Sequence, residues 1–202
     1  MTRLIIEKQV HDKILNYKRG KIIFSDMFSS LGNLESINKV LFRLTQKGLL
    51  VRLAQGIYLY PKQDKELGTL YPSVEEIAEA IAKRDKARIM PTGVQALNKL
   101  GLSTQVPMKA VFLTDGAPRS ILVGKRTIKF KKTTPKNLAA KSEVCGLAIQ
   151  ALREIGYKNI TPEQLDKIKQ VLRNEKKELL ANDARLAPAW IAKIILSVSS
   201  NN

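Results

Sequence analysis

Cysteine and histidine each occur once in the 202 residues, as Cys145 and His11. One cysteine excludes an internal disulfide and leaves no partner for a thiolate zinc site. Cys145 lies in an apolar helical run, where packing is favoured over reactivity, and we expect His11 at the surface of a helix. A catalytic triad or a Cys–His pair would have to use these lone residues. We therefore predict no metal site and no activated nucleophile.

Clustered carboxylates and a phosphate-binding loop are also lacking. A nucleotidyltransferase needs closely spaced carboxylates that hold two metal ions on a strand-rich core. The β-prone region of this chain has only Asp115, which falls in a turn. Residues 116–125 superficially resemble a phosphate loop, but the G-x4-G-K spacing fails and the segment joins two strands. We predict no catalytic residues and no cofactor, and thus a binding protein in place of an enzyme.

Long apolar runs are missing as well. None approaches the length that a transmembrane helix requires, and residues 1–7 are too few and too charged for a signal peptide. The sequence therefore predicts a cytoplasmic protein that makes no use of a membrane.

Acidic residues are heavily outnumbered, with 35 Lys and Arg against 18 Asp and Glu and a net charge of +17. Such an excess favours polyanions, because each neutralised phosphate releases condensed counterions. Residues 1–62 carry 11 basic and 4 acidic side chains, residues 63–134 carry 13 and 7, and residues 135–202 carry 11 and 7. Because no single block holds the excess, the whole body is a candidate for lying along phosphate.

The first 62 residues have the order of elements found in a winged helix-turn-helix. Helix, short strand, short helix, helix and hairpin are predicted at residues 4–17, 22–24, 27–31, 33–47 and 49–60. Asn33 is a suitable N-cap for the third helix, and Gly48 ends it. Gly56 lies in the short connection of the hairpin.

The remaining residues, 63–202, predict a second domain of mixed α/β type, so the expected fold class is α+β. Residues 62–68 are polar and are interpreted as a linker, and Ser73 with Glu76 forms a capping box for the next helix. Extended runs are predicted at 88–91, 109–114, 120–123 and 127–132, and helices at 92–100, 142–155, 162–180 and 188–198. These runs indicate a small antiparallel sheet followed by C-terminal helices.

The third helix carries the candidate DNA-reading residues. Four apolar residues at i, i+3, i+4 and i+7 form one buried stripe over residues 37–44. On the opposite face, Asn and Gln can bond adenine edges and Arg or Lys can bond guanine, if this helix lies in the major groove. The residues assigned to reading bases are Asn38, Lys39, Phe42 and Arg43, with Gln46 beside them and Lys47 on phosphate. Phe42 has two interpretations, contact with a thymine methyl or packing against the first helix or the hairpin.

Further basic residues flank this helix. Arg52 and Gln55 lie near the tip of the hairpin, where an arginine suits either phosphate or the minor groove. Lys18, Arg19 and Lys21 precede the second helix and are placed to grip the DNA backbone. The alternative interpretation of these charges is a solvated rim.

Two segments resemble the AbiEi antitoxin-like regulators. Residues 44–58 (LTQKGLLVRLAQGIY) resemble the wing signature of that family, which has a leucine, a lysine-glycine turn, an arginine and then glycine, aliphatic and tyrosine. Residues 91–102 (PTGVQALNKLGL) look like the "AL…LGL" segment of its second domain, and residues 111–114 and 128–130 resemble the strands that follow. The likeness covers roughly residues 5–135.

The resemblance implies a DNA-binding winged helix paired with a second domain that counteracts a nucleotidyltransferase-like toxin. It also implies repression of the protein's own operon through inverted repeats in double-stranded DNA. The wing arginine of the family corresponds to Arg52, whereas Gln55 stands where the family often has a second basic residue. Inverted repeats would suit a homodimer on DNA. The helix at 188–198 is apolar nearly all round, which indicates a core helix or, if it is exposed, the dimer or partner surface.

Two other functions fit the same sequence. One is a winged-helix transcription regulator without a toxin partner, whose second domain senses a ligand or dimerises. The other is an RNA- or ribosome-binding basic protein, which the even spread of charge favours. Against it, only eleven Phe, Tyr and Trp occur, and no run interleaves basic with aromatic residues.

Overall fold

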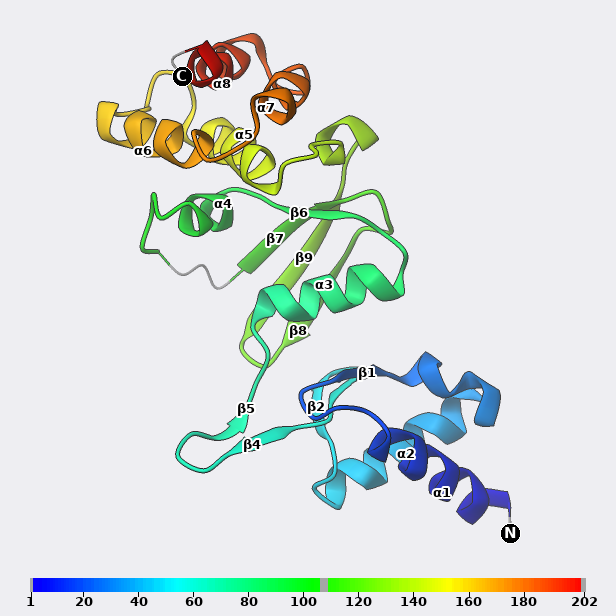
Figure 1. Cartoon of the computed structure of the whole chain (residues 1–202). Helices are drawn as coiled ribbons and strands as arrows, with labels where there is room; N and C mark the ends of the chain where they lie inside the picture. Colours follow the sequence, from blue (N-terminus) through cyan, green and yellow to red (C-terminus); the bar gives the residue numbers. More distant parts are fainter. Residues whose placement is uncertain (1, 106–108, 201–202) are drawn as a thin grey trace. The chain divides into compact units, whose positions relative to one another are not determined.

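The computed structural model describes residues 2–105 and 109–200 (Figure 1). The fold is a mixed α+β arrangement with small sheets and C-terminal helices. The chain divides into two compact units, residues 1–80 with 122–125 and residues 81–121 with 126–202. The boundary falls inside helix α3 (Val74–Arg84), whose N-terminal capping box is confirmed, because Ser73 and Glu76 exchange hydrogen bonds between side chain and backbone.

Within the first unit, residues 2–59 form two α-helices, a 3-10 helix and a three-stranded antiparallel sheet of order β1-β3-β2. These elements are α1 (Thr2–Leu15), β1 (Ile22–Phe24), the 3-10 helix η1 (Ser25–Leu31), α2 (Leu34–Gln46), β2 (Val51–Ala54) and β3 (Ile57–Leu59). The predicted local signals are present. The Asn33 side chain accepts a hydrogen bond from the Ser36 backbone N–H at 2.8 Å, and Gly48 and Gly56 have positive φ angles of 75° and 69°.

The core of this unit lies between α1, η1, α2 and the sheet. Its members are buried apolar or aromatic side chains: Val10, Ile14, Ile23, Phe28, Ile37, Val40, Leu41, Leu44, Leu50, Tyr58 and Tyr60. The four-residue stripe predicted on α2 is therefore confirmed, since all of its members are buried. Burial of one face of an amphipathic helix leaves the other face directed away from the core.

Residues 62–68 were interpreted as a linker, but they belong to a hairpin that extends to Leu70, so the expectation of an unstructured segment is wrong. Strand β4 (Lys62–Asp64) pairs antiparallel with β5 (Gly68–Leu70). The Asp64 carboxylate accepts hydrogen bonds from the backbone N–H groups of Glu66 and Leu67, and these bonds lower its pKa. The Asp64 side chain thus supplies hydrogen-bond acceptors to the backbone N–H groups of the turn. The strands were not predicted because the segment has almost no pattern of apolar residues.

The second unit contains a four-stranded sheet of order β6-β7-β9-β8. Its strands are β6 (Ile89–Pro91), β7 (Lys109–Thr114), β8 (Arg119–Val123) and β9 (Arg126–Lys132). The expectation of an antiparallel sheet holds for β6 and β7 but is wrong for β7 and β9, which pair in parallel. The reason is that β9 inserts between β7 and β8, an order that turn signals do not encode. Helix α4 (Val94–Lys99) lies between β6 and β7 in the chain, and the 3-10 helix η2 (Pro135–Leu138) follows β9.

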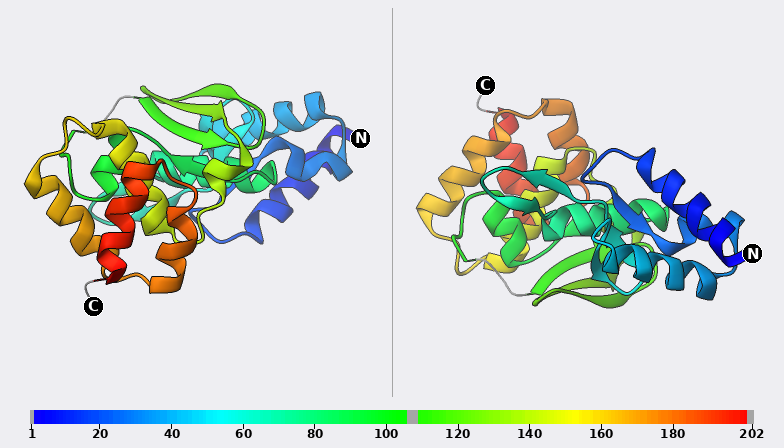
Figure 2. Two further views of the ribbon diagram at one scale, coloured as in Figure 1. Left: turned by 90° about the horizontal axis from the view of Figure 1, so that it is seen from above. Right: turned by 90° about the horizontal axis from the view of Figure 1, so that it is seen from below.

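Four helices complete the second unit: α5 (Glu143–Ile155), α6 (Pro162–Leu172), α7 (Lys177–Ala184) and α8 (Ala189–Ser200). Figures 1 and 2 show them grouped together. Their core is continuous with α4, and Ile191 and Ile195 of α8 are fully buried in it. The face of α8 that carries these two residues therefore belongs to the core, which is one of the two interpretations made from the sequence.

The single helix predicted at 162–180 is wrong, because the chain turns after Leu172 and starts α7 at Lys177. The turn brings the buried Asp183 to the start of α5. There its carboxylate accepts hydrogen bonds from the backbone N–H groups of Lys141 and Ser142, both at 2.9 Å. Among the residues that the structure describes, none of the helices has the length and apolar character that crossing a membrane requires.

Candidate nucleic-acid interface

A concavity of about 460 Å³ opens on the first unit, between the exposed face of α2 and the β2–β3 hairpin. Polar, basic and aromatic side chains line it: Glu35, Asn38, Lys39, Phe42, Arg43, Arg52, Gln55 and Tyr58, with Gly56 at the turn. Six of the eleven residues proposed from the sequence are therefore brought together here. Gln46, Lys47, Lys18, Arg19 and Lys21 are outside this lining.

Asn38 is held at the junction of α2 and the sheet. The hydroxyl of the buried Ser25 donates a hydrogen bond to Oδ1 of Asn38 at 2.6 Å. The Ser25 backbone N–H in turn bonds to the carbonyl of Gly56 in the hairpin turn, at 3.1 Å. These two bonds fix the orientation of the Asn38 amide, which makes it a preorganised donor and acceptor.

Arg43 and Lys47 share one carboxylate. Oε2 of Glu7, on α1, accepts from Nε of Arg43, and Oε1 of Glu7 accepts from Nζ of Lys47, both at 2.7 Å. The hydrogen bonds from Lys47, and then from Arg43, lower the pKa of Glu7. Nη2 of Arg43 is buried and has no hydrogen-bond partner among the described residues.

Acidification should weaken this bridge. Because the pKa of Glu7 is lowered in the folded protein, its ionised form stabilises the fold above the ordinary glutamate pKa, and this contribution is lost as the pH falls. We expect the Tm difference between wild type and Glu7→Gln to shrink between pH 7 and about pH 3. Thermal melts of both proteins across that range test it, and a constant difference would contradict a stabilising bridge.

The ion pair that Lys39 forms lies at the protein surface. It forms an i,i+4 ion pair with Glu35, and both side chains are mostly exposed. The hydrogen bond from Lys39 lowers the pKa of Glu35. Exposed pairs of this kind are weak, so Lys39 can exchange its partner for an incoming anion at little cost.

Phe42 lines the concavity with 52% of its surface exposed. About half of its surface is therefore open to solvent or to a ligand. A large exposed aromatic beside basic side chains is a typical anchor for a ligand surface.

The hairpin contributes Arg52 and Tyr58, which face each other across β2 and β3. Arg52 is exposed, and Tyr58 is buried. Burial raises the pKa of Tyr58, while the positive charge of Arg52 opposes the shift. Tyr58 therefore stays neutral near pH 7, and Arg52 supplies the positive charge on the hairpin side of the concavity.

The basic residues before η1 have aromatic partners. The guanidinium of Arg19 lies over the ring of Tyr60 at 4.8 Å and donates to the carbonyl of Pro61. Nζ of Lys21 lies 5.5 Å from the centre of the Tyr17 ring. Arg19 and Lys21 remain exposed, as does Lys18. Cation–π contacts orient such side chains without removing their charge.

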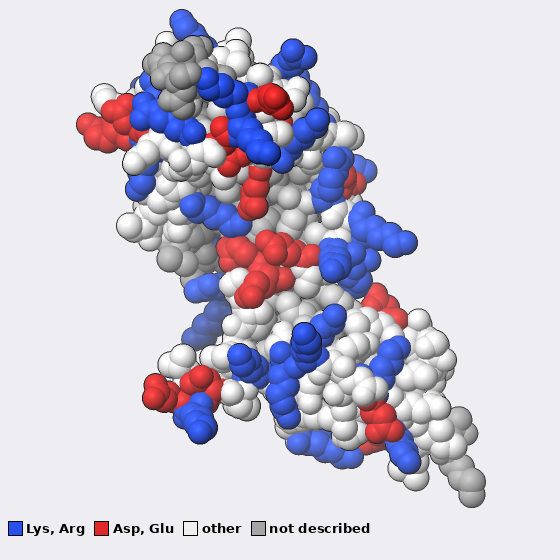
Figure 3. Space-filling model, viewed as in Figure 1, with Lys and Arg blue, Asp and Glu red and all other residues white. Residues whose placement is uncertain are grey.

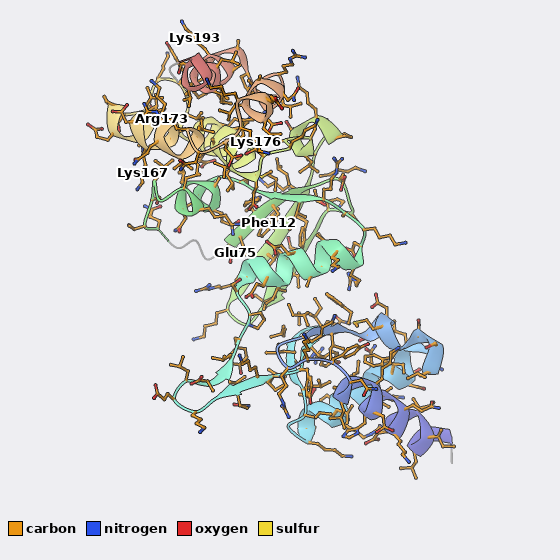
Figure 4. The ribbon with its side chains drawn as sticks, viewed as in Figure 1. Glu75, Phe112, Lys167, Arg173, Lys176 and Lys193 are labelled. Carbon is orange, nitrogen blue, oxygen red and sulfur yellow. The ribbon has the colours of Figure 1, made fainter. Side chains whose placement is uncertain are left out.

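Charge elsewhere on the molecule is mixed. Figure 3 shows Lys and Arg side chains over much of the visible face, with acidic side chains gathered over α3, which carries Glu75, Glu76 and Glu79. Figure 4 places Lys167, Arg173, Lys176 and Lys193 among the C-terminal helices. Nζ of Lys167 donates to the carbonyl of Gly101 after α4, so this lysine has a structural role as well.

A model of the DUF6088 family, described as a family of unknown function, matches residues 9–180. The chain belongs to DUF6088. The crystal structure of the RV2827C protein from Mycobacterium tuberculosis is similar to this DUF6088 member, at 13% sequence identity and a TM-score of 0.44. That similarity covers 94% of this chain and 79% of the other. A comparison of this chain with curated proteins gives no significant match.

Within residues 2–105 and 109–200, no group of three or more His, Cys, Asp or Glu side chains is placed to hold a metal ion. Cys145 is buried, and burial followed by the charges of Asp183 and Glu175 raises its pKa to about 12. The thiol is therefore protonated and inert at neutral pH.

Two residues that position side chains of the candidate interface, Ser25 and Glu7, were not predicted from the sequence. The sequence pattern indicates a special role for Glu7, because Val10 and Ile14, three and seven residues later, lie on the same face of α1 and are buried. An acidic residue on such a stripe needs a cationic partner.

Proposed function

We propose that this protein is a sequence-specific DNA-binding repressor whose residues 1–62 act as a winged helix-turn-helix. The observation that carries the proposal is the concavity between α2 and the β2–β3 hairpin. It gathers Asn38, Lys39, Phe42, Arg43 and Arg52 on one open surface of a strongly basic chain. In this proposal α2 enters the major groove and the hairpin is the wing.

The chemistry of the lining suits duplex DNA. The oriented amide of Asn38 can bond N6 and N7 of adenine. The guanidinium of Arg43 can bond a guanine edge. Phe42 offers an apolar surface to a thymine methyl. Arg52 is placed on the hairpin for phosphate or for the minor groove, while Lys18 and Lys21 supply positive charge for the backbone.

The resemblance to AbiEi-like regulators extends the proposal to the biological role. In that role the protein represses its own operon, and the second unit counteracts a nucleotidyltransferase-like toxin. The basic character of the chain and the resemblance of residues 91–102 support this extension. Co-expression with the gene that follows in the operon tests it, and a product whose toxicity this protein fails to relieve would contradict the antitoxin role.

Fluorescence anisotropy tests DNA recognition directly. The probes are a labelled duplex from the region immediately upstream of the protein's own gene, called the upstream duplex, and a scrambled duplex of equal composition. We expect tighter binding to the upstream duplex, and a preference that persists when the salt concentration is raised. Phosphate contacts alone would give equal binding that weakens steeply with salt for both probes.

Equal binding to the two duplexes would overturn the repressor proposal. A labelled single-stranded RNA of matched length is the third probe, because an RNA-binding basic protein is the competing function. Tighter binding to this RNA than to either duplex would favour that alternative.

A further inference from the structure

Glu7 reaches across from α1 to two cations of α2 that lie one helical turn apart. Arg43 and Lys47 stand at i and i+4, and each takes a different oxygen of the Glu7 carboxylate at 2.7 Å. Arg43 lines the concavity, whereas Lys47 lies outside it with its side chain 65% exposed. One carboxylate therefore links a proposed base-reading residue to a proposed phosphate contact.

The pairing of Arg43 is incomplete. A guanidinium and a carboxylate form their strongest pair through two parallel N–H···O bonds. Here only Nε of Arg43 bonds to Glu7, because Lys47 occupies the second oxygen, Oε1. Nη2 of Arg43 remains buried without a hydrogen-bond partner in the described part of the chain. An unpaired buried donor costs free energy, so the free protein holds Arg43 in a state that a second bond would improve.

We infer that Glu7 is a positioning residue that couples the phosphate contact of Lys47 to base reading by Arg43. When a DNA phosphate attracts Lys47, Oε1 of Glu7 becomes available to accept from Nη2 of Arg43. The Nε–Nη2 edge of the guanidinium is then locked against Glu7, and Nη1 is left to bond an acceptor of guanine, O6 or N7. The inference rests on the proposed function, because it concerns the same DNA-binding surface.

The coupling makes specificity depend on Glu7 and general affinity depend on Lys47. Without the carboxylate, Arg43 is a mobile cation that any phosphate can attract, so discrimination between bases weakens. Without Lys47, both Glu7 oxygens are available to Arg43, so base reading persists while one phosphate contact is lost. Removal of the carboxylate should therefore change the preference between duplexes, whereas removal of Lys47 should change the affinity for both duplexes equally.

The test measures the anisotropy of the upstream and scrambled duplexes with three variants of the full chain. For Glu7→Gln we expect the preference for the upstream duplex to fall about tenfold, with affinity for the scrambled duplex unchanged or higher. For Lys47→Ala we expect both affinities to fall by the same factor, roughly threefold to tenfold, and the salt slope to drop by about one. Asp12→Asn removes the same charge from an exposed position on α1 and should leave the preference unchanged.

The outcomes separate the inference from the function. If wild type fails to discriminate the two duplexes, the proposed function and the inference are both overturned. If wild type discriminates and Glu7→Gln discriminates equally well, only the inference is overturned. A purely structural role for Glu7 would lower the affinities for both duplexes together and lower Tm, without changing their ratio, and that result would also contradict positioning.

Discussion

We expect Phe42→Ala to weaken binding to the upstream duplex by roughly thirtyfold, about 2 kcal/mol, while the Tm stays within a degree or so of wild type. The binding loss follows from the position of Phe42, a half-exposed aromatic among the polar and basic groups that line the concavity. The Tm changes little because Phe42 is not part of the buried core, and because alanine is at least as good a helix former as phenylalanine. Anisotropy and thermal melts of the same preparations measure both quantities.

Leu34→Ala is the matched control for this substitution. Leu34 is on the same helix, is also more than half exposed, and is not among the residues that line the concavity. We expect its removal to leave duplex binding within about twofold of wild type. Equal losses for the two variants would assign the effect to general exposure of α2, and an unchanged affinity for Phe42→Ala would remove this ring from the proposed interface.

Asp183→Ala is expected to cause the largest loss of stability, about 3 kcal/mol in the second unit. The side chain is 1% exposed, and its carboxylate accepts from two backbone N–H groups at the start of α5. Alanine provides no acceptor, so these donors lose a charged partner in a part of the fold where water enters poorly.

Urea unfolding followed by tryptophan fluorescence measures this loss, because Trp190, on α8, is the single tryptophan of the chain. Glu178→Ala is the control on the same helix, at an exposed position, and should shift the midpoint little. Under folding conditions Asp183→Ala should still bind the upstream duplex, because every residue of the concavity belongs to the first unit. A midpoint equal to that of wild type would show that the Asp183 clamp contributes no net stability.

Elements with strong local signals were predicted accurately. The Asn33 cap, the 37–44 stripe and the glycines after α2 and in the β2–β3 turn placed α2 and the hairpin to within a few residues. The capping box at Ser73 likewise marked the start of α3. Such signals work because the interactions they describe connect residues only a few positions apart.

Long-range contacts account for the errors in the second unit. The predicted 162–180 helix is divided into α6 and α7, and Asp183 of α7 bonds Lys141 and Ser142, about forty positions earlier in the chain. Strand β9 pairs in parallel with β7 because it inserts between β7 and β8, and turn residues specify where a chain reverses but not which strand becomes its neighbour.

The same division applies to the candidate site. The sequence by itself determined which face of α2 is polar, that Asn38, Lys39, Phe42 and Arg43 share that face, and that a hairpin carrying Arg52 follows, because helical periodicity and turn chemistry are local. Only the tertiary structure decided that Glu7 bridges Arg43 and Lys47, that Ser25 orients Asn38, and that Phe42 stays exposed. Those outcomes depend on how α1, η1 and the sheet pack around α2, and packing between distant segments is not encoded in the spacing of residues along one helix.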